Sequence, residues 1–205
     1  MFLDSFGNVY NDGFVSYNNP IKSFIESRKI TKLVHFTNGK NIKSIDKYGI
    51  LSVAELQKRG WFYSKNDEMR LDGLLDFISL SITDINHFVF DKFVNNGSLK
   101  DPHIVIISPR ILWESNNKRL YCIANAATKS PRGGTLKDLK ALFDDVVEYN
   151  VGGKTRTINR QARDLNQPTD PQAEILFQRI VERKYIMEYY PYEHKYFYKD
   201  EDIFC

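Results

Sequence analysis

Short apolar stretches separated by polar, glycine-containing segments recur along the chain, and their spacing predicts three helices. One begins at Pro20, whose fixed backbone angle suits the first helical position. A second covers residues 40–48 and is ended by Gly49. A third begins at Thr135, with Asp138 in the capping-box position, where each side chain satisfies a backbone amide of the other residue.

Five other stretches have the apolar or alternating character of strands. They cover residues 33–37, 77–82, 103–107, 174–181 and 185–190. The continuous apolar run at 103–107 predicts burial on both faces of a sheet. Because the strands and helices are short and mixed, the pattern favours an α+β fold with a mostly antiparallel sheet.

Polar segments separate these elements. Residues 1–29 predict an N-terminal arm followed by a short helix, and residues 30–205 predict a single domain. The charged stretch 57–76 and the polar stretch 150–172 are interpreted as long loops. Loops of this length in a compact domain usually carry function or are disordered.

Composition narrows the class of protein. Apolar residues make up 42% of the 205 positions, which is enough for a packed core. The net charge of +3 is too small to indicate nucleic-acid binding by itself, so local clusters of charge must decide. The N-terminus lacks the features of a signal peptide, and no segment approaches the ~20 apolar residues of a membrane span. Cys122 and Cys205 form no Cys-x-x-Cys pair, so neither a disulfide scaffold nor a structural zinc site is expected, and a reducing cytoplasm is the natural compartment. Because no membrane span is found, we also expect no contact with a membrane.

Several kinds of site are not supported by motifs. The chain has neither the GxGxxG fingerprint of a dinucleotide-binding fold nor the GxxxxGK[ST] pattern of a P-loop. Four histidines are scattered without the spacing of metal ligands: His35, His87, His103 and His194. No metal site is therefore expected.

His35 and Thr37 alternate on a predicted strand, so both side chains point to the same face. Two polar groups on an otherwise apolar strand require partners. A buried histidine satisfied by backbone groups is the commoner explanation for such a pair. An imidazole and a hydroxyl are equally suited to hold ribose hydroxyls or an amide of a ligand.

Glu174 opens an apolar strand directly after a segment that contains Pro168 and Pro171. The two prolines restrict the backbone that leads into the strand. A carboxylate at this position is either a solvated strand end or a charge held in a fixed place. The residues alone do not separate the two interpretations.

Positive charge is concentrated in one stretch, which carries Lys154, Arg156, Arg160 and Arg163 without an acidic residue. It is either a solvated loop or a loop that contacts the phosphates of a nucleic acid beside Glu174. Arg70 lies in a charged helical turn, where an ion pair at the surface would account for it.

Five segments taken together resemble the DarT-type DNA ADP-ribosyltransferases, the toxin halves of bacterial toxin–antitoxin pairs. They occur in family order across most of residues 30–185: LVHFTNGKNIKSIDKYGILS (33–52), NDEMRLDGL (66–74), FISLS (77–81), IVIISPRILW (104–113) and TDPQAEILF (169–177). The segment around DPQAE is the most specific of the set.

The resemblance implies an ADP-ribosyltransferase fold, in which two packed, mainly antiparallel β-sheets with flanking helices surround a cleft for NAD⁺. It implies that His35 and Thr37 bind NAD⁺, and we expect the adjacent Asn38 to assist them. Arg70 matches the catalytic arginine, which also contacts NAD⁺. Glu174 matches the catalytic glutamate, and the basic stretch before it corresponds to the substrate-recognition loop.

The function implied by the resemblance is the attachment of ADP-ribose from NAD⁺ to a base in single-stranded DNA. The protein would act as a toxin or phage-defence effector in the bacterial cytoplasm, with a macrodomain antitoxin as its partner. When the bond between nicotinamide and ribose breaks, positive charge develops on the ribose carbon, and Glu174 can stabilise it. Because the pKa of arginine exceeds ~12, Arg70 is assigned first to charge stabilisation, and whether it also accepts a proton is left open.

Two alternatives remain at this stage. A transferase with the same fold could act on RNA or protein, since only the substrate loop would differ. A nucleic-acid-binding module on the same fold could lack catalysis altogether, although the presence of His35, Thr37, Arg70 and Glu174 argues against it.

Overall fold

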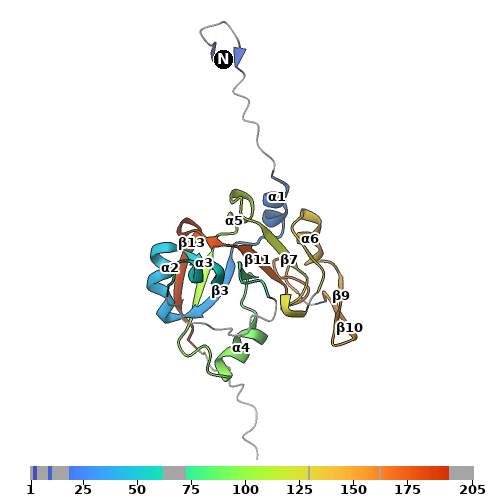
Figure 1. Ribbon diagram of the computed structural model, residues 1–205. Helices are drawn as coiled ribbons and strands as arrows, with labels where there is room; N and C mark the ends of the chain where they lie inside the picture. The colour runs from blue at the N-terminus through green and yellow to red at the C-terminus, as the bar shows by residue number, and fades with distance from the viewer. Residues whose placement is uncertain are drawn as a thin grey trace, which may run out of the picture.

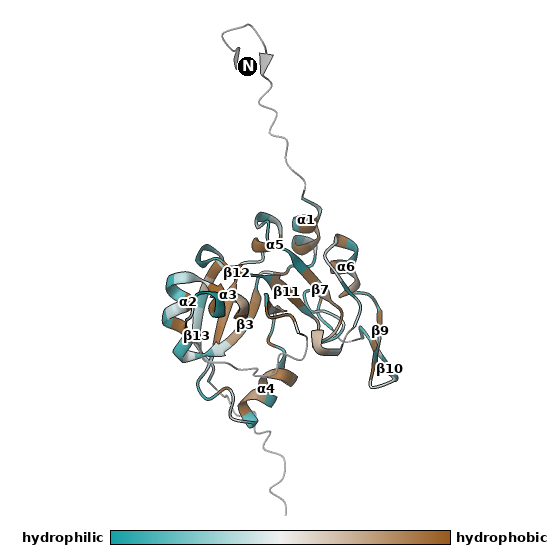
Figure 2. Cartoon of the chain, viewed as in Figure 1, coloured by the Kyte–Doolittle hydropathy of each residue, from teal (hydrophilic) through white to brown (hydrophobic). Residues whose placement is uncertain are grey.

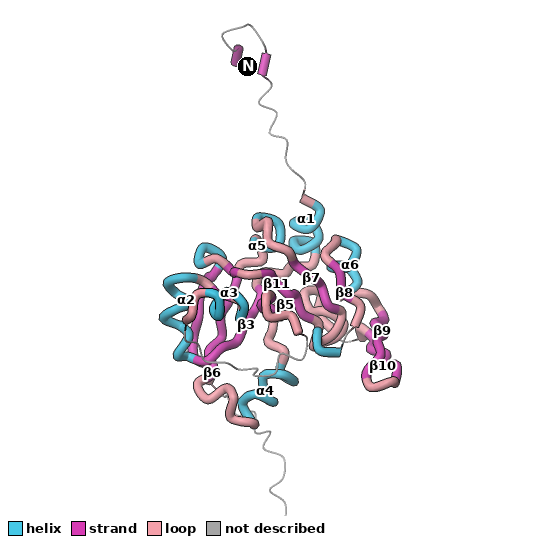
Figure 3. Tube along the Cα trace, viewed as in Figure 1, coloured by secondary structure: helices cyan, strands magenta, loops and turns pink. Residues whose placement is uncertain are grey.

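The computed structural model describes residues 19–61, 73–128, 130–161 and 163–193, together with the backbone of two short paired strands, β1 (Phe2–Leu3) and β2 (Val9–Tyr10). A seven-stranded sheet forms its centre, flanked by short helices (Figures 1 and 3). The strand order is β13 (Ile186–Pro191), β6 (Pro102–Ile107), β3 (Leu33–Asn38), β5 (Phe77–Ile82), β11 (Glu174–Gln178), β7 (Arg119–Cys122) and β8 (Arg132–Gly133). All neighbouring strands are antiparallel, as the sequence predicts.

The sheet divides into two halves between β3 and β5. These strands pair only at Leu33 with Ile82 and at Val34 with Ser81. Beyond this two-residue ladder β3 pairs with β6 alone, as far as Asn38, and β5 pairs with β11. The two sheets expected from the sequence are thus β13–β6–β3 and β5–β11–β7–β8, joined at one corner, and we call the region where β3 leaves β5 the fork.

The central strands are rich in apolar residues, which are brown in Figure 2, and these residues pack into clusters on both faces of the sheet. The largest cluster joins one face of both halves to four helices: α1 (Pro20–Ser27), α2 (Ile42–Tyr48), α5 (Ile111–Glu114) and α6 (Leu136–Ala141). A second cluster packs α4 (His87–Asn95) on the opposite face of β3 and β6. The buried run Ile104–Ile107 contributes alternately to both clusters, as its continuous apolar character predicts.

Local sequence signals account for the helix boundaries. The Asn19 side chain accepts from the Ile21 amide at 3.0 Å and starts α1 at Pro20. Thr135 and Asp138 form the predicted capping box of α6. Helix α1 sends its buried residues into the main core, so the boundary expected after residue 29 does not coincide with a break in packing.

The prediction of a loop over residues 150–172 is wrong in its first half. Strands β9 (Val146–Val151) and β10 (Lys154–Asn159) form an antiparallel hairpin, which projects beyond α6 in Figure 1. Gly152 and Gly153 connect the strands with φ of 57° and 79°, values that suit the two-residue turns of hairpins. The remaining segment folds back onto the base of the hairpin.

Three other differences concern short elements. The expected strand 174–181 is interrupted at Arg179, which has φ of 65°, and continues as β12 (Ile180–Val181) beside β4 (Ile50–Leu51). Helix α3 (Val53–Lys58) occupies the start of the expected loop 57–76, of which residues 62–72 lie outside the described part of the chain. Helix α4 was not predicted. The 3₁₀ turns are η1 (Gly39–Asn41), η2 (Ala126–Thr128) and η3 (Arg183–Tyr185).

Candidate active site

His35 occupies the fork between the two halves of the sheet. Its Nδ1 lies 3.0 Å from the carbonyl oxygen of Ser79 in β5. The imidazole therefore bridges β3 and β5 at the point where their backbone ladder has ended. Because a carbonyl oxygen only accepts, Nδ1 carries the hydrogen in this contact.

Glu174 begins β11, and its carboxylate is held in a fixed position rather than solvated. The residue is 6% exposed. One carboxylate oxygen accepts from the Ser79 hydroxyl, and the other accepts from the Ala126 amide at 2.5 Å. Of the two interpretations that the sequence left open, the fixed charge is the one observed.

Ser79 joins the two candidate residues, since its carbonyl contacts His35 and its hydroxyl donates to Glu174. The sequence carries a signal for this role. Ser79 and Ser81 alternate within an otherwise apolar strand, so both face one side and need polar partners. The amide of Ala126 had no comparable signal, because it depends on how η2 folds against β11.

Thr37 and Asn38 lie at the far end of β3, and both are 4% exposed. The Thr37 hydroxyl accepts from the Asn41 side chain at 2.9 Å. The Asn38 amide donates to the Ser98 carbonyl and accepts from the Asp101 amide, at 3.1 and 3.4 Å. Asn38 therefore fastens the end of β3 to the loop before β6, which is a structural role beside the one expected for it in binding NAD⁺.

Arg70 lies outside the described residues, so its predicted position in the site has no counterpart here. Two aromatic residues, Tyr48 and Trp61, are described at and before the start of the segment that carries Arg70. The rings of Tyr48 and Trp61 pack on each other with centroids 4.6 Å apart, and Lys47 and Arg59 lie over one ring each. The two rings, which are tilted by 51°, contact each other within the protein directly before residues 62–72.

The four basic residues of the predicted DNA loop separate into two pairs. Lys154 and Arg156 are exposed on β10. The Arg160 guanidinium instead donates to the Gln167 and Asp164 carbonyls, at 2.9 and 2.8 Å. Burial is the main cause that lowers its pKa.

Arg163 completes the second pair, because its Nε donates to the Pro168 carbonyl at 3.1 Å. Arg160 and Arg163 therefore shape the segment before β11, and only Lys154 and Arg156 present charge outward. The sequence could not separate these pairs, since the carbonyls that bind the two inner arginines are brought to them by the fold.

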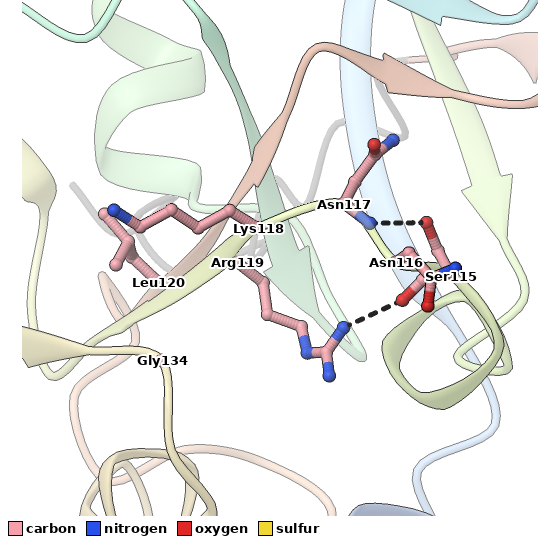
Figure 4. A pocket seen from close by; sticks show the side chains of 7 residues that line it. All are labelled: Ser115, Asn116, Asn117, Lys118, Arg119, Leu120 and Gly134. Atoms are coloured by element: carbon pink, nitrogen blue, oxygen red, sulfur yellow. Dashed lines mark hydrogen bonds between the residues drawn. The ribbon is translucent and has the colours of Figure 1, made fainter.

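A cavity of about 350 Å³ lies at the start of β7, apart from Glu174, which pairs with Cys122 at the end of that strand. Its lining includes Ser115, Lys118, Arg119 and Gly134 (Figure 4). The Arg119 side chain turns toward α5 and donates to the Ser115 carbonyl at 3.1 Å, whereas Lys118 points away from it (Figure 4). The two cations diverge, so they do not form a joint anion site.

Within the described ranges, no three His, Cys, Asp or Glu side chains are grouped to hold a metal ion. None of the helices seen there combines the length and apolar character that crossing a bilayer requires.

The family model of DarT, described as ssDNA thymidine ADP-ribosyltransferase, matches residues 34–196. The chain belongs to the DarT family. The match includes β3 with His35 and β11 with Glu174 and ends beyond β13. The family resemblance inferred from the sequence segments is thereby confirmed.

Among solved structures, this DarT-family chain is similar to Thermosipho africanus DarTG in complex with ADP-ribose. The two share 19% sequence identity, and the TM-score is 0.49. The alignment covers 80% of this chain and 44% of the other, so this chain spans less than half the length of that protein. No curated protein matches the chain.

Proposed function

We propose that this DarT-family chain transfers ADP-ribose from NAD⁺ to thymidine in single-stranded DNA, with Glu174 as the catalytic carboxylate. The observation that carries the assignment is the position of Glu174 at the fork. Its carboxylate and the His35 imidazole converge on Ser79 from the two halves of the sheet. A fixed negative charge beside a ligand-binding imidazole suits a substrate whose ribose becomes positively charged.

In the proposed reaction, the bond between the nicotinamide nitrogen and the ribose carbon breaks, and nicotinamide leaves. A ring nitrogen of the thymine base forms the new bond to that carbon and loses its proton, so NAD⁺ and the base yield the ADP-ribosylated base, neutral nicotinamide and one proton released to solvent. Glu174 stabilises the positive ribose and can accept a hydrogen bond from a ribose hydroxyl, while His35 and Thr37 hold other parts of NAD⁺. Arg70 is assigned, by family resemblance, to polarising the base and contacting NAD⁺.

Labelled NAD⁺ tests the assignment when incubated with single-stranded DNA, RNA or protein. We expect label on thymidine-containing DNA, and mass analysis of oligonucleotides identifies the modified base. Transfer to RNA or protein alone would replace the proposed acceptor. Absence of NAD⁺ turnover with every acceptor would favour a non-catalytic binding module instead.

We further propose that a macrodomain antitoxin is the partner of this toxin, as the family resemblance implies. An antitoxin of this kind should remove ADP-ribose from the modified oligonucleotide. Persistence of the label after incubation with a macrodomain protein encoded beside this chain would contradict the assignment.

Lys154 and Arg156 are the residues proposed to contact DNA phosphates. Replacing both with Glu should weaken oligonucleotide binding about tenfold or more and reduce the slope of log affinity against log salt by ~1.4, or ~0.7 for each phosphate contact. Fluorescence anisotropy at several salt concentrations measures both quantities. Since β10 is exposed at both positions, thermal stability should change little.

Lys22→Glu/Lys29→Glu provides a control with the same change in net charge on exposed residues of the α1 region. This variant should bind the oligonucleotide with a salt dependence close to that of the unmodified protein. Equal weakening by both double variants would mean that total charge, rather than the hairpin, governs DNA binding.

A further inference from the structure

The segment between the hairpin and Glu174 is fastened to the base of the hairpin. The Thr169 amide donates to the Leu142 carbonyl at 2.8 Å, and its hydroxyl donates to the Asp144 carbonyl at 2.6 Å. Arg160 binds the same segment through its guanidinium, and its own amide donates to the Asp145 carbonyl at 2.8 Å. The chain thus reaches β11 along a path set by contacts with the hairpin rather than as an independent loop.

A buried hydrogen bond joins this path to the hairpin itself. The Tyr149 hydroxyl on β9 donates to Asp170 at 2.6 Å, and the two residues are 4% and 0% exposed. The other oxygen of Asp170 accepts from the Gln172 amide at 2.8 Å, and its carbonyl accepts from the Ala173 amide at 3.0 Å. Asp170 therefore organises the turn that ends at Ala173, directly before Glu174.

Packing alone does not explain this pair. The Tyr149 ring lies in a small apolar cluster with Ala124 and Val147, where a phenylalanine would serve as well. A fully buried carboxylate is costly to desolvate, and a hydrophobic replacement is often at least as stable. Burial and the bond to Asp170 raise the pKa of Tyr149, so its hydroxyl remains a donor at physiological pH.

The partner of Tyr149 across the hairpin ladder is Arg156, one of the two exposed cations proposed to bind DNA. A displacement of β10 by a bound strand is therefore passed to β9 at Tyr149. The hydroxyl of that residue is bonded to the turn four positions before Glu174. The route from the exposed surface to the carboxylate consists of one ladder pair, one hydrogen bond and one turn.

We propose, building on the function proposed above, that Tyr149 and Asp170 are positioning residues that couple the β9–β10 hairpin to the catalytic carboxylate. Engagement of DNA by the hairpin fixes the turn at Asp170, and the turn sets Glu174 against the ribose of NAD⁺. The pair contacts neither substrate and acts through Glu174.

Tyr149→Phe tests the coupling, because it removes the hydroxyl and keeps the ring. The turnover number for transfer to a thymidine-containing oligonucleotide should fall about 10- to 100-fold, since displacement of a catalytic group by ~1 Å has effects of that size. The KM for NAD⁺ should stay within about twofold, because His35 and the NAD⁺-binding end of β3 are untouched. Asp170→Asn should act in the same direction, and the double variant should lose no more than the single ones.

Tyr121→Phe is the matched control. Tyr121 is 0% exposed on β7, and the charged side chain beside its hydroxyl is Arg119 rather than Asp170. Removing the Tyr121 hydroxyl deletes the same kind of buried group at a position that is not bonded to Asp170, so turnover should stay within about twofold. Equal turnover in the Tyr149→Phe variant and the unmodified protein would overturn the proposal, as would a rise in the KM for NAD⁺ with unchanged turnover.

Hydrogen exchange separates the coupling from the reaction. In the unmodified protein, adding a thymidine-containing oligonucleotide without NAD⁺ should slow exchange of the amides at 170 and 172–174 about threefold or more. The Tyr149→Phe variant should lack this response. If the unmodified protein shows the response but transfers no ADP-ribose, the coupling stands and the proposed function fails. The same response in both proteins would overturn the coupling while leaving the function intact.

Discussion

Replacing Glu174 with Gln is expected to lower the rate of ADP-ribose transfer by about 10²- to 10³-fold while leaving the protein folded. The amide has the shape of the carboxylate but no negative charge to stabilise the positive ribose. Its oxygen can still accept from the Ala126 amide, and the Ser79 hydroxyl can rotate to accept from the new NH₂ group. Transfer of label from NAD⁺ to an oligonucleotide gives the rate, and circular dichroism gives the melting temperature.

Glu182→Gln is the control for this substitution. Glu182 is an exposed carboxylate paired with Lys184 at 2.8 Å, with both side chains at the surface. The control should retain full activity, because an exposed ion pair contributes little to the stability of the folded protein. Substantial transfer by the Glu174→Gln variant would show that another group carries the reaction.

Gly49→Ala is expected to destabilise the protein by more than ~3 kcal/mol, the upper end of backbone strain at a single residue. Gly49 ends α2 with φ of 80°, a conformation that side chains rarely adopt, and a Cβ there would lie 2.2 Å from the Val181 carbonyl oxygen. Because that neighbour is backbone in β12, it cannot rotate away. In a domain of this size the melting temperature should fall by about 10 °C.

Gly60→Ala separates the clash from the backbone conformation. Gly60 has φ of 65°, but a Cβ there would meet no atom within 4 Å among the residues whose structure is described. Only the conformational penalty of ~1–2 kcal/mol should appear. Similar losses of stability in the two variants, measured by thermal unfolding, would mean that α2 can shift away from β12.

The parts of the fold that follow from neighbouring residues were predictable. The capping box of Thr135 and Asp138, the end of α2 at Gly49 and the buried strand β6 each depend on a short stretch of sequence. The hairpin was missed although its turn, Gly152-Gly153, stands between two stretches of strand-like alternation. The polar character of the whole segment 150–172 favoured a loop more strongly than the Gly-Gly turn favoured a hairpin.

The arrangement of the candidate site depends on contacts between distant residues. Ser79 and Glu174 are separated by 95 positions, and His35 and Ser79 by 44, so their convergence at the fork comes from strand order. Family resemblance identified His35 and Glu174 as candidates without any knowledge of the strand order. It did not distinguish Arg156, which is exposed, from Arg160, which binds backbone carbonyls.

The two-residue ladder between β3 and β5 has a mechanical consequence. Each half of the sheet is internally paired along its strands, but only Leu33 and Val34 join β3 to the other half. Beyond Val34 the halves are therefore joined by side chains, among them the bridge from His35 to Ser79 and the shared apolar core, and not by a continuous backbone ladder. With so short a ladder between the halves, we expect the spacing of β3 and β5 to adapt to its surroundings more easily than the spacing of strands within either half.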